Sequence, residues 1–416
     1  MRSPAGALIF IALFLLLDTY VFQAIKSVTV ASNHRSRMVV YGIYWLLTLL
    51  TLCGFVLFIS TGPGFLPKNV RTYLFALIIG LFLAKFAAIF FILVDDLRRL
   101  VTYVTLNFFY GGKNEPAMGA DGISRSVFLS WLGLAAGGGV FTTLLYGFNN
   151  IYRYNVKNVK LFFDNLPAGF RGMRVVQISD IHSGSFTHKK SVEQGLALIK
   201  AQNPDLILFT GDLVNNLAEE MDGFRELFGS LKAPLGVYSV LGNHDYGDYV
   251  RWPNKGITQA ENLELLKKLQ ADMGWRLLLN EHVELQRNGD RIALIGIENW
   301  SSKARFPKYG KLGKAYAGAE NYPFKILMSH DPSHWDAEVR KNYPNIDLTL
   351  SGHTHGMQFG IDVPGFRWSP VQYIYRQWAG LYEEAKQKLY VNVGFGFIGY
   401  PGRVGVLPEI TVIELA

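Results

Sequence analysis

The chain has 416 residues, half of them hydrophobic, with a mean hydropathy of +0.15 and a formal net charge of +8. It contains no dense Lys/Arg run and no nucleic-acid-binding motif, so the basic charge favours acidic substrates or an anionic membrane surface over a nucleic-acid partner. Because Cys53 is the only cysteine, the sequence excludes a disulfide framework and a thiolate metal site within the chain.

The first 150 residues are mostly apolar stretches, whereas residues 151–416 have the mixed composition of a globular domain. Four stretches are long enough to cross a bilayer as helices, which takes about 20 residues. The first has no clear cleavage site and is followed by three more, so it is a retained span rather than a signal peptide. The sequence therefore predicts a multi-pass protein of the cell membrane, with a transmembrane region at 1–150 and a soluble domain at 151–416. The spans cover roughly 7–27, 38–60, 73–95 and 126–147.

Two features of the membrane region stay open at this level. The lysines and arginines that flank the spans are divided almost evenly between the two sides, so they do not determine which face of the bilayer the soluble domain occupies. Asp18 lies inside the first span, where a carboxylate is costly and often functional. The alternative is that Asp18 lies near a helix end or faces the interior of the helix bundle.

The soluble domain alternates short strand-like apolar runs with helical patterns, which favours a layered α/β fold. A polar residue follows each of the first five strands, and ligands after neighbouring strands converge on one edge of a sheet, so we expect one site there. Strands are expected at 173–179, 206–210, 237–241, 324–329, 346–350, 388–393 and 409–414, with a hairpin at 282–297 and helices at 190–202, 217–231, 258–273 and 333–342.

Five short motifs in this domain carry nitrogen and oxygen side chains of the kind that bind metal ions. Each of them alone is most often a cap, a turn residue or a satisfied polar group. Five of the nine histidines, however, fall within these motifs, each just after an apolar strand, so chance does not account for the whole set. The motifs are Asp180-Ile181-His182, Gly211-Asp212, Gly242-Asn243-His244-Asp245, His330 and Gly352-His353-Thr354-His355.

Together these motifs resemble the signatures of the calcineurin-like metallophosphoesterase superfamily, namely Asp-x-His, Gly-Asp, Gly-Asn-His-Asp, His and Gly-His-x-His. The resemblance covers nearly all of the soluble half and none of the four-span region. It implies a four-layer αββα sandwich, in which two sheets are flanked by helices. The segments FRGMRVVQISDIHSG, LGNHDYG, LSGHTHGMQ and VNVGFGFIGYPGRVGVLPEI are similar to a membrane-associated bacterial branch of broad-specificity phosphodiesterases and UDP-2,3-diacylglucosamine pyrophosphatases.

Carried over position by position, the resemblance implies a site for two divalent metal ions bridged by Asp212. His244 corresponds to the catalytic histidine near the leaving-group oxygen. Met357 departs from the branch, which often has a second glycine there, and it could narrow the approach to the site. The resemblance places one metal ion between Asp180, His182, Asp212 and His355, and the second between Asp212, Asn243, His330 and His353.

The ligand set also indicates its chemistry, because nitrogen and oxygen donors suit Mn, Fe, Zn or Ni better than a soft metal. Two cations about 3.5–4 Å apart can clamp both oxygens of an in-line displacement and lower the pKa of a bridging water, so that hydroxide attacks phosphorus. His244 would protonate or stabilise the departing oxygen. Asp245, next in the sequence, either orients His244 or only caps a turn.

The sequence therefore predicts a membrane-anchored dinuclear-metal phosphoesterase. It would hydrolyse phosphodiester or pyrophosphate bonds of a phosphorylated small molecule or a lipid-linked substrate. One alternative is a broad-specificity phosphatase or phosphodiesterase whose anchor only sets its location. The other is a non-hydrolytic membrane sensor or transport protein with a metal-binding domain.

Three segments bear on the substrate without deciding it. An aromatic segment is either a wall of the site that contacts a lipid or nucleobase, or the packing of a long loop. The insertion 246–262 is either a lid or a surface loop, and a basic run either attracts phosphates and headgroups or is solvated. The aromatic segment contains Phe366, Trp368, Tyr373, Tyr375 and Trp378, and the basic run contains Lys303, Arg305, Lys308, Lys311 and Lys314.

Overall fold

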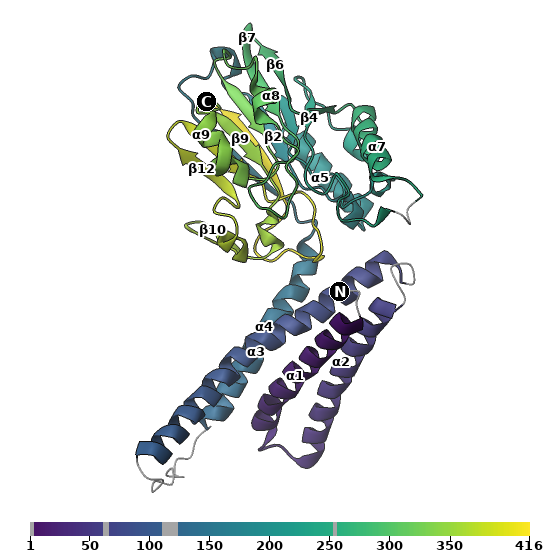
Figure 1. The fold of residues 1–416 in the computed structure, drawn as a ribbon, viewed down its shortest axis with the longest axis vertical. Helices are drawn as coiled ribbons and strands as arrows, with labels where there is room; N and C mark the ends of the chain where they lie inside the picture. The colour runs from purple at the N-terminus through teal and green to yellow at the C-terminus, as the bar shows by residue number, and fades with distance from the viewer. Residues whose placement is uncertain (1–3, 61–65, 110–123, 253–255) are drawn as a thin grey trace. The chain divides into compact units, whose positions relative to one another are not determined.

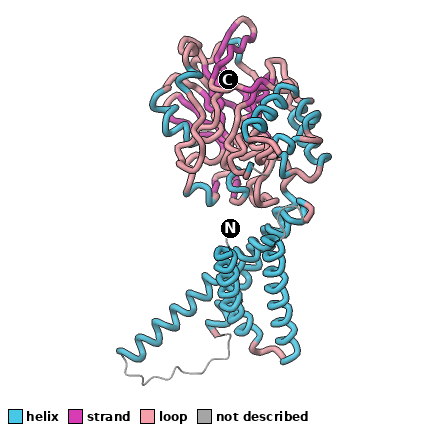
Figure 2. The backbone as a smooth tube through the Cα atoms, turned by 45° about the vertical axis from the view of Figure 1, so that its right-hand side comes forward, coloured by secondary structure: helices cyan, strands magenta, loops and turns pink. Residues whose placement is uncertain are grey.

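The computed structural model describes residues 4–60, 66–109, 124–252 and 256–416, and the chain divides into two compact units, Met1–Tyr146 and Gly147–Ala416. The first unit is helical, and the second is a mixed α/β domain with its strands in the centre (Figures 1 and 2). The fold class predicted from the sequence, an apolar helical region followed by an α/β domain, is confirmed.

Four apolar helices in the described part of the first unit are each long enough to cross a membrane. The third is longer than the predicted span, which was expected to end at 95. Charged residues at that point suggest the end of a span, but Asp95 and Arg98 form an ion pair of 2.9 Å within one turn, which is compatible with a continuing helix. The helices are α1 (Pro4–Thr29), α2 (His34–Ser60), α3 (Lys68–Phe109) and α4 (Arg125–Gly147).

Asp18 faces the interior of this unit. Its side chain is fully buried, and its Oδ1 lies 2.6 Å from the Nζ of Lys85 on α3. The same oxygen accepts a hydrogen bond of 2.9 Å from the hydroxyl of Tyr44 on α2. The lysine of the third span thus compensates the aspartate of the first, and one polar cluster joins three helices.

Substituting one partner of this ion pair should destabilise the helical unit more than substituting both partners. We expect Asp18→Asn and Lys85→Met each to destabilise the helical unit by about 3–5 kcal/mol, because each leaves a buried partner uncompensated. The double substitution should lose clearly less than the sum of the two. The measurement is unfolding of the full chain by SDS in mixed micelles, followed by far-UV circular dichroism, and strictly additive losses would contradict the pairing.

Two six-stranded mixed sheets lie in the middle of the second unit. In the first sheet β2 to β5 are parallel, and in the second β7, β8, β9 and β13 are parallel. In spatial order, the first sheet contains β1 (Asn155–Leu161), β14 (Glu409–Leu415), β2 (Arg174–Ile178), β3 (Leu206–Phe209), β4 (Val237–Ser239) and β5 (Arg276–Leu277). The second contains β12 (Gly380–Glu384), β13 (Gln387–Val391), β9 (Leu348–Ser351), β8 (Lys325–Met328), β7 (Asp290–Gly296) and β6 (Glu281–Arg287).

The two sheets pack face to face, and helices cover their outer faces (Figure 1). The core between the sheets contains residues of both, such as Leu208 of β3 and Met328 of β8. Leu196 and Leu266 pack on the outer face of the first sheet, and Ala315 packs on that of the second. The covering helices include α5 (Lys189–Ala201), α6 (Arg225–Gly229), α7 (Gln259–Asp272) and α8 (Leu312–Tyr316). The domain is therefore an αββα sandwich.

Some element predictions were wrong in detail. The expected helix at 217–231 is a 3-10 turn at Ala218–Met221 followed by α6, and Gly223 between them has a φ of +84°, which interrupts the helix. The expected helix at 333–342 is a π-helical turn at Trp335–Val339 followed by the short α9 (Arg340–Asn342). Strand β1 was missed because it is a partly exposed edge strand in which polar residues outnumber apolar ones.

Candidate metal centre

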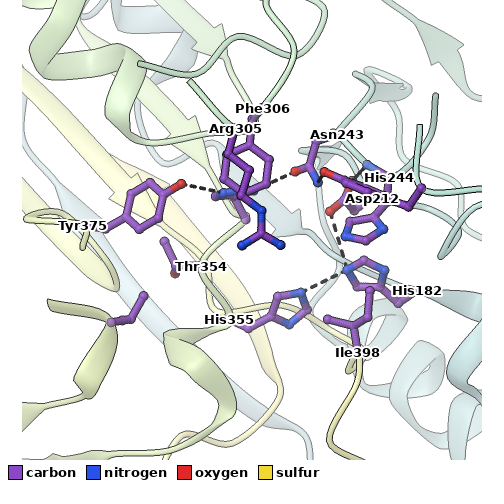
Figure 3. Close-up of a pocket in the computed structure, with 13 residues that line it drawn as sticks. His182, Asp212, Asn243, His244, Arg305, Phe306, Thr354, His355, Tyr375 and Ile398 are labelled. Carbon is purple, nitrogen blue, oxygen red and sulfur yellow. Dashed lines mark hydrogen bonds and ion pairs between the residues drawn. The ribbon is translucent and has the colours of Figure 1, made fainter. Parts of the chain in front are cut away.

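All seven predicted metal ligands lie in the loops that follow the strands of the two sheets, and their side chains converge on one site. Figure 3 shows four of them, His182, Asp212, Asn243 and His355, around the cavity. Six of the seven form two groups of three, and within each group the ligand atoms lie within 4.8 Å of one another. The site opens into a cavity of about 390 Å³. The groups are Asp180, His182 and His355, and Asp212, His330 and His353, with Asn243 beside the second group.

In the first group, three side chains point at one another. The Nε2 atom of His355 lies 3.0 Å from the Nε2 of His182 and 3.2 Å from the Oδ1 of Asp180. The residues are buried, so water does not separate them. Nitrogen and carboxylate oxygen atoms that face a common point form a donor set that suits a divalent cation.

In the second group, the Nε2 of His330 lies 3.2 Å from the Oδ2 of Asp212 and 3.3 Å from the Nδ1 of His353. The same Nδ1 lies 2.8 Å from the side-chain oxygen of Asn243. The Oδ2 of Asp212 also lies 3.5 Å from the Nε2 of His182, which belongs to the first group. One carboxylate oxygen therefore faces both groups.

Backbone carbonyls fix the orientation of two histidines. The Nδ1 of His330 is 2.7 Å from the carbonyl oxygen of Thr210, and the Nδ1 of His244 is 2.7 Å from that of Asn215. Since a carbonyl only accepts, each Nδ1 carries the proton, and each Nε2 is left to face the site. His244 lines the cavity, and its ring centroid is 5.0 Å from that of His182.

Five of the seven predicted ligands have a left-handed backbone conformation, with φ between 47° and 73°. Residues other than glycine rarely adopt it, and each instance costs of order 1–3 kcal/mol. Such strain persists where surrounding contacts determine the conformation and is concentrated at functional sites. The five residues are Asp180, His182, Asp212, His353 and His355.

Two glycines leave room for the carboxylates. A side chain at Gly242 would place its Cβ 2.2 Å from the Oδ1 of Asp212, and one at Gly352 would place it 2.2 Å from the Oδ2 of Asp180. Both distances are shorter than any van der Waals contact. The glycines that precede Asn243 and His353 are therefore required by the close approach of the loops.

Asp245 joins two of these loops and does not orient His244. Its carboxylate accepts hydrogen bonds from the backbone N–H groups of Asp212, Leu213 and Gly242, at 2.8–2.9 Å. Burial and the nearby Asp212 carboxylate raise the pKa of Asp245 to about 7. Of the two roles considered from the sequence, its contacts are those of a cap.

The buried groups shift one another's pKa values. Burial by itself would lower the pKa of His330, but the carboxylates of Asp212 and Asp180 raise it to about 10. Burial lowers the pKa of His182 well below its ordinary value. Burial would also raise the pKa of Asp180, yet His355 holds it below the ordinary value. The site thus buries carboxylates that require positive charge beside them, and a divalent cation satisfies that requirement.

Three side chains outside the predicted ligand set contact its members. Arg403 is fully buried, and its guanidinium donates to the carbonyl of Val393 at 2.9 Å and lies 3.4 Å from the Nδ1 of His355. The hydroxyl of Tyr375 is 2.8 Å from the Nε2 of His353. The hydroxyl of Tyr249 accepts from the side-chain amide of Asn243 at 3.0 Å.

The segments left open by the sequence divide between the two alternatives. In the aromatic segment, Tyr375 lines the cavity and Trp378 is buried, whereas Phe366 and Tyr373 are exposed. The insertion 246–262 contributes Tyr249 to the cavity, and its residues 253–255 lie outside the described part of the chain. Of the basic run, Arg305 lines the cavity. Met357, which could have narrowed the approach to the site, is 48% exposed and does not line the cavity.

Two family models match this chain, one over the helical unit and one over part of the second unit. A family model described as "Probable Calcineurin-like phosphoesterase, transmembrane domain" matches residues 2–150, and one described as "Calcineurin-like phosphoesterase" matches residues 173–357. These two models, with the four apolar helices, agree on a multi-pass membrane protein that carries a phosphoesterase domain.

Three curated relatives illustrate the range. A zebrafish (Danio rerio) "Transmembrane protein with metallophosphoesterase domain" is 31% identical over 62% of this chain, which spans 57% of that relative's length. The Bacillus subtilis "Uncharacterized metallophosphoesterase YkuE" is 29% identical, covering 60% of this chain and 81% of the relative. The Chlamydia muridarum "UDP-2,3-diacylglucosamine pyrophosphatase LpxG" is 27% identical, covering 55% and 79%.

Removal of divalent metal should destabilise the second unit. An ion that binds only the folded state stabilises it by RT ln(1 + [L]/Kd), about 2.7 kcal/mol at a hundredfold excess over Kd. We expect EDTA to lower the Tm of the full chain in detergent, and added Mn²⁺ to restore it, as followed by calorimetry. In an Asp212→Asn variant the response to EDTA should be smaller, and an unchanged Tm in the unsubstituted protein would contradict the metal centre.

Proposed function

We propose that this chain, which belongs to the calcineurin-like phosphoesterases with an N-terminal four-helix transmembrane domain, hydrolyses phosphodiester or phosphoanhydride bonds with two divalent metal ions. The observation that carries the proposal is the position of Asp212, whose Oδ2 lies 3.5 Å from His182 in one group and 3.2 Å from His330 in the other. A carboxylate between two ligand groups suits a two-metal phosphoesterase.

The residues present fit two metal ions of the Mn, Fe, Zn or Ni type, because every ligand is a nitrogen or oxygen donor. When bound, the two ions supply Lewis acidity at the phosphoryl oxygens and lower the pKa of a nucleophilic water. Asp212 is the proposed shared ligand. The first ion would also be held by Asp180, His182 and His355, and the second by Asn243, His330 and His353.

His244 is the proposed general acid for the leaving group. It lines the cavity beside His182, and its Nδ1–H donates to the carbonyl of Asn215 at 2.7 Å. This hydrogen bond occupies the Nδ1–H, so in the imidazolium form of His244, which carries a proton on both nitrogens, Nε2–H is the group that can give a proton to the departing oxygen. The backbone N–H of His244 donates to the Oδ1 of Asp212 at 2.8 Å. This hydrogen bond fixes the position of the proposed acid relative to the proposed bridging carboxylate.

The role of His244 predicts a dependence on the leaving group. We expect His244→Gln to lower kcat/KM by about 10²–10⁴ for diesters with an alkoxide leaving group, which needs a proton. The loss should be much smaller for a p-nitrophenolate leaving group, which departs without one. Rates would be measured on the full chain in nanodiscs with Mn²⁺.

The control for this experiment is Asp212→Asn, which removes the proposed bridge and should abolish hydrolysis of both substrates. An equal loss for the two leaving groups in His244→Gln would argue against proton donation. If the unsubstituted chain hydrolyses neither substrate with any divalent metal, the non-hydrolytic sensor or transport protein becomes the better explanation.

Arg305 supplies a cation for the substrate. Its side chain lines the cavity, and Figure 3 shows the guanidinium directed into the open space near Tyr375 and His355. Within the described part of the chain, no ion pair holds it. Arginine binds phosphate oxygens in a bidentate manner, so Arg305 suits a second phosphate group beside the one at the metals. This position favours a pyrophosphate over a simple monoester.

The Arg305→Gln substitution should therefore discriminate between substrates. We expect KM for a nucleoside-diphosphate ester to rise about tenfold or more, because a charge-assisted hydrogen bond contributes about 1.5–3 kcal/mol. KM for bis(p-nitrophenyl) phosphate should change little. Lys311→Gln is the matched control, since Lys311 belongs to the same basic run but does not line the cavity. Equal effects of the two substitutions would remove Arg305 from substrate binding.

Within the pyrophosphates we infer a lipid-linked substrate. Two observations support it: the catalytic domain is attached to four membrane spans, and a relative is named a UDP-2,3-diacylglucosamine pyrophosphatase. The second candidate is a broad phosphodiesterase whose anchor only sets its location. Rates on a lipid diphosphate in vesicles and on a water-soluble diester, both with Mn²⁺, separate the two. Equal rates would remove the preference for lipid.

A further inference from the structure

Exposed hydrophobic side chains are concentrated in one short segment of the second unit. Of the thirteen large hydrophobic residues that are exposed in the described part of this unit, six lie between positions 357 and 374, and their exposed fractions run from 44% to 78%. Single exposed apolar residues are normal on a protein surface, but a concentrated group marks an interaction site. We call these six residues the apolar surface: Met357, Ile361, Val363, Phe366, Tyr373 and Ile374.

Three of them lie on a hairpin formed by β10 (Ile361–Val363) and β11 (Phe366–Trp368). Ile361 and Val363 are two residues apart on one strand, and Val363 pairs with Phe366 on the other, so their side chains share one face. All three are exposed, at 44%, 52% and 55%. One face of the hairpin is therefore apolar and uncovered.

The polar face of the hairpin is bonded to the rest of the domain. Asp362 lies 2.7 Å from the Nζ of Lys157 on β1 and 3.1 Å from the Nε of Arg367 on β11. The guanidinium of Arg367 also donates to the carbonyl of Ala379 at 2.7 Å. A two-stranded ribbon in water normally turns its apolar face inward and its polar face outward. This hairpin has the opposite arrangement.

The apolar surface begins close to the point where the chain leaves the last membrane helix. Helix α4 ends at Gly147, whose carbonyl accepts from the backbone N–H of Arg403 at 2.9 Å. The next residue, Val404, forms a β-bridge with Phe359 and accepts from the N–H of Gly360 at 2.9 Å. Gly360 immediately precedes β10. Within the second unit, the segment Arg403–Val404 therefore links the hairpin to Gly147, the last residue of α4, through backbone hydrogen bonds.

We propose that the apolar surface docks on the lipid interface of the bilayer that holds the four spans. The hairpin is connected through Arg403 and Val404 to Gly147, which lies near the end of the last candidate membrane span. Phe366 and Tyr373 are of the aromatic type that is enriched at that boundary. Arg376 lies two residues after Ile374, and its side chain is 75% exposed and forms only a long ion pair of 3.9 Å with Glu384, so it suits anionic headgroups.

Docking has a consequence for the substrate that rests on the proposed function. The cavity is lined by Val371 and Tyr375, which belong to the same stretch of chain as Tyr373 and Ile374. An apolar surface in the lipid interface therefore brings one wall of the cavity to the level of the headgroups. A lipid phosphate could then reach the metal centre without leaving the bilayer.

Fluorescence quenching by brominated lipid tests the docking directly. The full chain, with Cys53→Ser to remove its native thiol, would carry an NBD label at Val363→Cys and be reconstituted in vesicles with or without dibromo-phosphatidylcholine. We expect quenching of the label at position 363. The matched control is Leu265→Cys on α7, where the native residue is 50% exposed and belongs to a different surface. No quenching at 363, or equal quenching at both positions, overturns the proposal.

A second variant separates docking from catalysis. Ile361→Asp combined with Phe366→Asp should weaken quenching of a label at Tyr373→Cys at least about twofold, since it replaces the apolar side chains that would be buried at the boundary with the acyl chains by carboxylates. Hydrolysis of bis(p-nitrophenyl) phosphate should be unchanged, which shows that the domain is folded, while that of a vesicle-embedded lipid diphosphate should fall about tenfold. Undiminished quenching in the variant overturns the docking. A chain that hydrolyses neither substrate contradicts only the proposed function, because quenching reports docking without turnover.

Discussion

The carboxylate of Asp212 is the interaction on which the site depends. Its Oδ2 faces His182 and His330, and its Oδ1 accepts the backbone N–H of His244. Its own backbone N–H is held by the buried Asp245. One side chain therefore sets the distance between the two ligand groups and the position of the proposed acid. Loss of this carboxylate would leave buried histidines without their shared negative partner, so stability and chemistry are coupled at this residue.

The fold brings these groups together because the two sheets end at the same place. His182 follows β2 of the first sheet, whereas His330 and His353 follow β8 and β9 of the second. Parallel strands that are packed face to face deliver their following loops to one edge. The loops approach so closely that glycine is needed before Asn243 and His353, and five of the predicted ligands have left-handed conformations. The large inter-sheet core stabilises the strained loops that it carries.

The convergence of the candidate ligands could be predicted because each motif is local, a polar residue directly after an apolar strand. What escaped prediction is long-range. Arg403 reaches His355 across 48 positions, and the acceptor for His244 is the carbonyl of Asn215, which has no side-chain signature. Gly223 is a residue type that often interrupts a helix, but the helical pattern of 217–231 outweighed it in the prediction. Likewise, the charge of Asp18 was evident in the sequence, but its pairing with Lys85 depends on how the spans pack.

The membrane anchor allows a surface with low membrane affinity to dock on the bilayer. A soluble domain that exposed Val363 and Phe366 would bind a bilayer only marginally, because few side chains enter the interface. Here the domain is covalently continuous with a span that ends at Gly147, so the bilayer is present at a high effective concentration. Docking then costs little additional entropy, because the domain is already held near the bilayer. A hairpin with its apolar face outward is sufficient for membrane contact. The inverted hairpin would be a liability in a free domain and is compatible with a tethered one.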